Sequence, residues 1–194
     1  MNSNKGNRGT SAGSVRVIGG KYRSRLLRVP ARPGLRPTPD RVRETLFNWL
    51  GQDLSGLACL DLFAGSGALG FEAASRGAAR VVMVEKDRAA ATELERNRAA
   101  LDASQVSIVN GDAVVFLGRE PGRFDVVFLD PPFRQNAVPA ILEKLPPRLG
   151  PDARVYVESE APVEVAAPWK ELKRARAGQV SYQLLQWDAN EDEP

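Results

Sequence analysis

The sequence contains no histidine, a single cysteine and no long apolar run, and each absence excludes a class of function. Without histidine, Ser-His-Asp hydrolysis, histidine acid–base catalysis and most zinc sites are ruled out, and we expect no metal. Cys59 has no partner for an internal disulfide, and its apolar neighbours favour a small buried side chain. No apolar stretch approaches the roughly 18–20 residues of a membrane span, and the N-terminal segment has no signal-peptide pattern. These absences predict a cytoplasmic protein that makes no membrane contact.

Positive charge is concentrated in the N-terminal part of the chain. Residues 1–43 contain eleven Lys or Arg and one acid, whereas the remainder contains sixteen basic and 23 acidic residues. From residue 16 onward the basic residues alternate with bulky apolar ones, which is typical of folded structure, while a solubilising tail is the better interpretation of residues 1–13. A basic arm on an acidic body predicts a polyanionic partner such as nucleic acid. The residues expected to contact it are Arg16, Lys21, Arg23, Arg25, Arg28, Arg36, Arg41 and Arg43.

The pattern of apolar residues divides the chain into four parts. Residues 1–13 predict a disordered basic tail, 14–38 a basic β-ribbon and loop, 39–188 the main domain, and 189–194 an acidic tail. Within the main domain, short apolar strands alternate with amphipathic helices, and the last two strand segments lie next to each other in sequence. This order predicts an α/β, Rossmann-like fold with a seven-stranded, mostly parallel sheet that ends in an antiparallel hairpin.

Three acidic residues follow three successive predicted strands. Asp61 ends the first strand and leads into a turn with glycines at 65 and 67, where the backbone can approach a ligand closely. Glu85 ends the second strand twenty positions after Gly65, where such folds place a carboxylate that binds ribose hydroxyls. Asp112 follows the third strand and is suited to accept a hydrogen bond from an adenine amino group. Each acid alone could be a helix N-cap or a solvated loop residue, but together they predict a cofactor crevice.

The tetrapeptide Asp130-Pro131-Pro132-Phe133 follows the fourth predicted strand and opens over the same crevice. Its two prolines lack N–H groups and fix the backbone, which leaves carbonyls free to face a substrate. The Asp130 carboxylate and the Pro131 carbonyl can both accept hydrogen bonds from an NH₂ group and orient its lone pair. Phe133 offers a ring on which an extruded base can stack. The pattern predicts methylation of an exocyclic amine of a nucleic-acid base.

Taken together, the segments LDLFAGSGALG, VEKD, NGDA and DPPF resemble the class I amino-methyltransferases. The segments RVIGGKYRSRLLRVP and GLRPTPDRVRETLFNWL are similar to the RsmD family, and the resemblance runs from about Val15 to Trp187. It implies transfer of a methyl group from S-adenosylmethionine to N2 of a guanine in 16S ribosomal RNA, with Asp130 to Phe133 holding the amine. Phe133 stands where the family often has Tyr. The cofactor-binding residues implied by the resemblance are Asp61, Phe63, Ala64, Gly65, Ser66, Gly67, Glu85, Lys86, Asp112 and Ala113.

Three alternatives remain open from the residues. A DNA adenine-N6 methyltransferase uses the same tetrapeptide, but such enzymes usually carry a sizeable target-recognition region. A nicotinamide-linked dehydrogenase shares the predicted sheet but leaves the Asp-Pro-Pro-Phe segment unexplained. A non-catalytic RNA-binding assembly factor would be free to lose the acids at 85, 112 and 130, which are present here. We expect a monomer, and the sequence leaves open whether naked RNA or a small-subunit assembly particle is the substrate.

Overall fold

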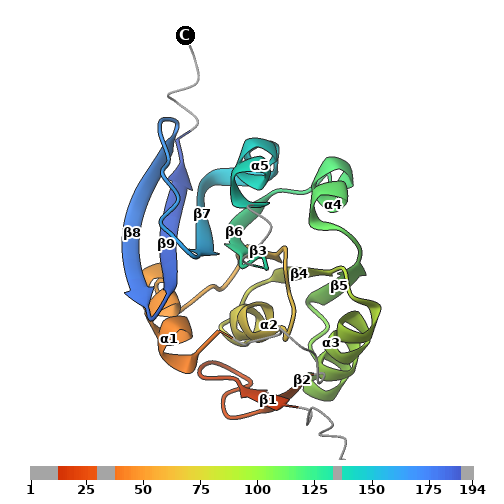
Figure 1. Cartoon of the computed structure of the whole chain (residues 1–194). Coiled ribbons are helices and arrows are strands. Elements are labelled where there is room, and N and C mark those ends of the chain that lie inside the picture. Colours follow the sequence, from red (N-terminus) through yellow and green to blue (C-terminus); the bar gives the residue numbers. More distant parts are fainter. Residues whose placement is uncertain (1–12, 30–37, 133–136, 189–194) are drawn as a thin grey trace, which may run out of the picture.

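The centre of the molecule is one seven-stranded sheet with the strand order β5-β4-β3-β6-β7-β9-β8 (Figure 1). The computed structural model describes residues 13–29, 38–132 and 137–188. Strands β3 to β7 run parallel, and β9 pairs antiparallel with both β7 and β8. The predicted fold class is therefore confirmed. The strands are β3 Ala58–Asp61, β4 Arg80–Glu85, β5 Val106–Asn110, β6 Phe124–Leu129, β7 Leu149–Ser159, β8 Trp169–Ala177 and β9 Val180–Trp187.

Helices cover both faces of this sheet, because its central strands are apolar on both sides. One face packs against α1 (Asp40–Leu50), α2 (Ala68–Ser75) and α3 (Arg88–Leu101), whose buried residues share one core cluster. The other face packs against α4 (Ala113–Arg119) and α5 (Ala137–Lys144), which a short 3₁₀ turn follows (Figure 1). Because β3, β4, β5 and β6 run parallel, their carboxyl ends lie at one edge of the sheet.

The predicted antiparallel ribbon is present, formed by β1 (Gly13–Arg16) and β2 (Leu26–Val29), and it lies beside α2 and α3 (Figure 1). The cross-strand pair Val15 and Leu27 faces inward and belongs to the same core cluster as α1 to α3. The backbone of Arg28 exchanges two hydrogen bonds with the Asn97 side chain of α3, at 2.9 and 2.8 Å. The ribbon is therefore docked on the main domain, and its core is continuous with that of the sheet.

Two helices show local features that the sequence did not indicate. Helix α4 was not predicted, because its seven residues AVVFLGR are too short and too apolar for a helical period to stand out. Helix α1 begins at Asp40 after an N-cap at Pro39 that makes no side-chain capping bond. The predictions for the tails at 1–12 and 189–194 lie outside the described residues. Within the described ranges, no helix is long and apolar enough to cross a membrane.

Candidate functional site

The turn between β3 and α2 requires glycine at two positions. Gly67 has a φ of 77° and Gly65 a φ of 50°, both in the left-handed region that favours glycine. A Cβ atom on Gly67 would lie 2.6 Å from the Leu94 side chain and 2.7 Å from that of Phe71. The Gly67 N–H also donates to the Ala64 carbonyl at 2.6 Å. The chain therefore turns tightly here and presents backbone groups in place of side chains.

Glu85 ends β4 directly beside this turn. Its Oε2 accepts a hydrogen bond from the Gly65 N–H at 2.8 Å, and its Oε1 accepts one from the Asp87 N–H at 2.7 Å. The side chain is largely buried, at 9% exposure. The predicted meeting of the glycine turn and Glu85 is confirmed. Backbone amides fix the orientation of this carboxylate, and fixed orientation is what selective binding of ribose hydroxyls needs.

Asp61, the last residue of β3, is hydrogen-bonded to the helix that follows the turn. Its side chain is buried, and Oδ2 accepts a hydrogen bond from the Gly70 N–H of α2 at 3.2 Å. Burial raises the pKa of Asp61 to about 7, against hydrogen bonds from the Gly70 and Phe63 amides that favour the charged form, and with repulsion from Glu85. The buried Asp61 carboxyl group fixes the start of α2 through the Gly70 N–H, and with its pKa raised to about 7 it is only partly charged at neutral pH.

Asp112 has the N-cap role that was weighed as its alternative. Its Oδ1 accepts hydrogen bonds from the N–H groups of Val114 and Val115 at the start of α4, at 3.0 and 3.3 Å. Its Oδ2 lies 3.2 Å from Nζ of Lys86, which lowers the pKa of Asp112. One oxygen therefore caps the helix and the other faces an exposed lysine. Ala113, the first residue of α4, is buried.

Asp130 follows β6 at the same edge of the sheet. Since Asp61 pairs with Phe128 in the register of β3 and β6, Asp130 lies one side-chain repeat beyond Asp61. Its Oδ2 lies 3.5 Å from the Thr38 hydroxyl, ahead of α1. Burial, then repulsion from Glu158 and Asp61, raises the pKa of Asp130 well above its ordinary value. Pro131 is buried and Pro132 exposed, and the predicted stacking residue Phe133 lies outside the described residues.

One buried acid of this region was not predicted. Glu158, near the end of β7, is 4% exposed, and its Oε1 accepts a hydrogen bond from the Tyr156 hydroxyl at 2.8 Å. Strands β6 and β7 pair Leu129 with Val157, so Asp130 and Glu158 follow as neighbours in the next position. No motif marks Glu158 in the sequence. The available signal was the acid at the carboxyl end of the strand that adjoins β6.

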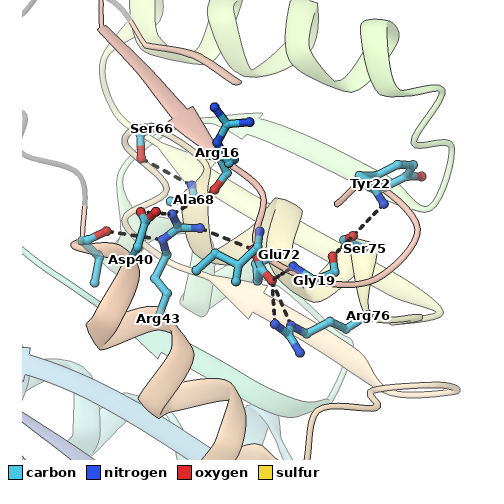
Figure 2. Close-up of polar contacts among 12 residues, drawn as sticks. Arg16, Gly19, Tyr22, Asp40, Arg43, Ser66, Ala68, Glu72, Ser75 and Arg76 are labelled. Carbon is cyan, nitrogen blue, oxygen red and sulfur yellow. Dashed lines mark hydrogen bonds and ion pairs between the residues drawn. The ribbon is translucent and has the colours of Figure 1, made fainter. Parts of the chain in front are cut away.

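The basic residues predicted to contact RNA are exposed in the structure, with one buried exception among those that it describes. Arg43 is 0% exposed, and its guanidinium contacts Glu72 at 3.3 Å, Asp40 at 2.7 Å and the Arg16 carbonyl at 2.9 Å (Figure 2). The prediction that Arg43 contacts RNA is therefore wrong, since its charge is used inside the protein. Arg36 lies outside the described residues. The exposed members of the predicted set are Arg16, Lys21, Arg23, Arg25, Arg28 and Arg41.

Glu72 of α2 is the centre of the buried network that holds the ribbon (Figure 2). Its two carboxylate oxygens accept hydrogen bonds from the N–H groups of Ile18 and Gly19, both at 2.8 Å. They also face the guanidinium groups of Arg43, at 3.3 Å, and Arg76, at 2.8 Å. Because α2 starts at the glycine turn, one helix joins the basic ribbon to the candidate cofactor crevice.

Residues 15–186 match the family described as Conserved hypothetical protein 95. The chain is 45% identical over 185 residues to ribosomal RNA small subunit methyltransferase D of Escherichia coli K12, covering 93% of each chain, and 44% identical over 182 residues to the Haemophilus influenzae protein of the same name, covering 90% of this chain and 94% of that one. The chain belongs to this family. The solved structure of the Escherichia coli protein yhhF superposes with a TM-score of 0.83 at 46% identity, over 91% of this chain and 99% of that one.

The site of this family member fits S-adenosylmethionine by the chemistry of its donor set. The cofactor carries cationic groups and a ribose diol, which need carboxylate acceptors and close backbone approach. Glu85, Asp61 and the glycine turn at 65–67 supply both features within one group of hydrogen bonds. The turn is not followed by the Gly-Lys-Ser/Thr sequence of a phosphate-binding loop, so it is not a nucleotide-phosphate site of that kind. The methyltransferase relatives and the carboxyl groups beside the glycine turn both indicate S-adenosylmethionine as the cofactor.

Proposed function

We propose that this protein transfers a methyl group from S-adenosylmethionine to the exocyclic N2 amine of a guanine in small-subunit (16S) ribosomal RNA. The observation that carries the proposal is the position of Asp130-Pro131-Pro132 after β6, at the sheet edge that also holds Asp61 and Glu85. The relatives named ribosomal RNA small subunit methyltransferase D support the ribosomal substrate. The guanine-N2 specificity rests on the resemblance to the RsmD family.

In this proposal the chain's own residues bind, orient and stabilise. Glu85 and the turn at 65–67 would hold the ribose and amino-acid parts of the cofactor, and Lys86, Asp112 and Ala113 would border its adenine. The cofactor supplies a methyl group bonded to a sulfonium sulfur, which a neutral amine can attack. Asp130 and the Pro131 carbonyl accept the two N–H groups of the substrate amine, so that its lone pair points at the methyl carbon. The Asp130 charge stabilises the positive charge that develops on nitrogen.

We further propose that the exposed basic ribbon positions the RNA. Arg23 is exposed in the turn between β1 and β2, and no acid among the described residues forms an ion pair with it. Contacts of this kind to phosphates orient a nucleic acid without reading its bases. The protein would act as a monomer in the cytoplasm, on ribosomal RNA that is either free or part of a small-subunit assembly particle.

Methyl transfer to separated substrates tests the proposal. Purified protein is incubated with labelled cofactor and either naked small-subunit RNA, small-subunit particles, large-subunit RNA or duplex DNA, and the label is assigned after digestion to nucleosides. We expect N2-methylguanosine from small-subunit RNA or particles, and the better of these two identifies the physiological form. Label in N6-methyladenine of DNA would identify the DNA alternative instead. Cofactor binding without any transfer would favour the non-catalytic assembly factor.

A further inference from the structure

The Asp130 carboxyl group is held by the protein at one of its two oxygens. Oδ2 accepts a hydrogen bond from the hydroxyl of Thr38, a residue 92 positions earlier in the chain, with 3.5 Å between the two oxygens. Among the described residues no donor is hydrogen-bonded to Oδ1. The two oxygens of a carboxylate accept hydrogen bonds separately, and the group turns about its bond to Cβ when neither is held. The contact with Thr38 therefore limits the directions in which the other oxygen points.

Thr38 is itself fixed by the buried Arg43. Thr38 is 7% exposed, and its carbonyl accepts a hydrogen bond from Nε of Arg43 at 3.3 Å. The other two guanidinium nitrogens contact Glu72 at 3.3 Å, Asp40 at 2.7 Å and the Arg16 carbonyl at 2.9 Å (Figure 2). A planar guanidinium that is bound at all three nitrogens cannot turn. The backbone of Thr38 therefore has a rigid support.

The surroundings of Asp130 oppose its charge, except for Thr38. Burial raises the pKa of Asp130 well above its ordinary value, and repulsion from Glu158 of β7 and Asp61 of β3 adds to this. The hydrogen bond from Thr38 acts in the opposite direction. Tyr156, a further titratable neighbour on β7, gives its hydroxyl hydrogen to Glu158 at 2.8 Å. Within the described ranges, Thr38 is thus the hydroxyl donor that favours the Asp130 carboxylate.

The Thr38 hydroxyl can also donate to Glu158, but it has one hydrogen and serves one acid at a time. Glu158 already accepts from Tyr156, whereas Asp130 meets no second donor in the described part of the chain. A buried acceptor that lacks any donor is the costlier one, so the hydrogen stabilises more at Asp130. The 3.5 Å separation is long for an O–H···O bond, and catalytic hydrogen bonds that are long in a free enzyme often tighten when substrate binds.

We propose that Thr38 is a positioning residue of the methyl-transfer site, whose hydroxyl holds Oδ2 of Asp130 so that Oδ1 faces the substrate amine. The inference rests on the proposed function, in which Asp130 accepts an N–H of that amine. Thr38 acts through Asp130 and does not touch the substrate. Because Arg43 supports the Thr38 backbone, the buried network that anchors the basic ribbon also fixes the acceptor carboxylate.

Three substitutions isolate the hydroxyl group. Thr38→Val removes it and keeps a β-branched side chain before Pro39, which retains the extended backbone. Thr38→Ser keeps the hydroxyl and loses a methyl group. Thr45→Val is the matched control, because the Thr45 hydroxyl donates to the Arg41 carbonyl at 2.9 Å on the exposed side of α1. Each protein is assayed by single-turnover methyl transfer to small-subunit RNA or particles at saturating substrates, with cofactor and RNA affinity measured in parallel.

We expect the single-turnover rate of Thr38→Val to fall about tenfold, which corresponds to the loss of roughly one neutral hydrogen bond in the transition state. Cofactor and RNA affinity should stay within about twofold, because neither ligand contacts Thr38. The rate of Thr38→Ser should stay within about threefold of wild type, and Thr45→Val should be unchanged. An unchanged rate in Thr38→Val, or a Thr38→Ser protein as slow as Thr38→Val, would overturn the proposal. If Thr38→Val does not fold, Thr38→Ala removes the same hydroxyl from a smaller side chain and replaces it in the comparison.

Carboxyl titration in the free protein tests the contact without any reaction. The side-chain ¹³C resonances of Asp130 and Glu158 are followed against pH in wild type and Thr38→Val. A donor to a carboxylate favours its charged form, so the pKa of Asp130 should rise in Thr38→Val and the acidic limb of the pH–rate profile should move to higher pH with it. A shift at Glu158 alone would assign the hydroxyl to that acid and contradict the proposal.

The two measurements separate this inference from the proposed function. If wild-type protein transfers no methyl group while the Asp130 titration moves in Thr38→Val, the proposed function fails and the contact between Thr38 and Asp130 stands. If wild-type protein methylates guanine and Thr38→Val changes neither the rate nor the Asp130 titration, the proposed function stands and the positioning role of Thr38 is refuted.

Discussion

Replacing Glu72 by Gln should destabilise the protein more than any exposed charge substitution. The Glu72 side chain is 0% exposed and lies between the guanidinium groups of Arg43, also 0% exposed, and Arg76, 7% exposed. Its loss of charge leaves Arg43 buried, and among the described residues only the exposed Asp40 is then a counter-charge. Breaking a buried ion pair in this way costs about 3–5 kcal/mol. The amide NH₂ of Gln would also face donors where Glu72 accepts from Ile18 and Gly19.

Urea and thermal denaturation measure this cost. For a chain of this size each kcal/mol lowers Tm by roughly 2–4 °C, so we expect a fall on the order of 10 °C with an unchanged m-value. The matched control is Glu95→Gln, whose partner Arg98 lies at 2.6 Å but whose side chain is 47% exposed. That change should cost less than about 1 kcal/mol. A Glu72→Gln protein within about 1 kcal/mol of wild type would refute the reasoning that this network anchors the ribbon.

Three further changes give distinct outcomes. Glu85→Ala should weaken cofactor binding in calorimetry by roughly tenfold to hundredfold, since a charge-assisted hydrogen bond contributes about 1.5–3 kcal/mol; unchanged affinity would remove Glu85 from the cofactor site. Replacing Arg23 and Arg25 together by Ala should raise KM for RNA and reduce the salt slope of RNA binding by roughly one to two units, whereas parallel salt plots of equal affinity would exclude a docking role. Because the pKa of Asp61 is raised to about 7 in the folded protein, unfolding free energy should fall as pH rises from the ordinary Asp value toward 7; Asp61→Asn should flatten this fall, and an identical pH dependence in both proteins would contradict it.

The main sheet was predictable from sequence because its signals are local. Each central strand is a short apolar run, and each is followed by a helix of clear period or by a glycine or proline turn. The contact between Gly65 and Glu85 also followed from spacing, because parallel strands end at the same edge of the sheet. Helix α4 was missed since AVVFLGR has the composition of a buried strand, although Asp112 caps it through the N–H groups of Val114 and Val115.

Residues that act through long-range pairing were not predictable. Arg43 has the same sequence context as its exposed neighbours, and its burial depends on Glu72, a residue 29 positions further along the chain. Glu158 likewise comes next to Asp130 through the register of β7 against β6, which the sequence does not specify. Charge counts and motifs identify which residue types are present. They do not tell which arginine faces solvent or which two carboxyl groups meet.

The central claim is that Asp130 holds a guanine amine for methyl transfer, and single-turnover transfer with nucleoside analysis tests it most directly. Wild-type protein and Asp130→Asn are compared on small-subunit RNA or particles at saturating cofactor, with cofactor affinity measured in parallel. We predict N2-methylguanosine as the wild-type product, a rate at least about a hundredfold lower for Asp130→Asn, in line with the loss of a transition-state acceptor, and cofactor affinity within about twofold. An undiminished rate in Asp130→Asn, or a methylated nucleoside other than N2-methylguanosine, would contradict the claim.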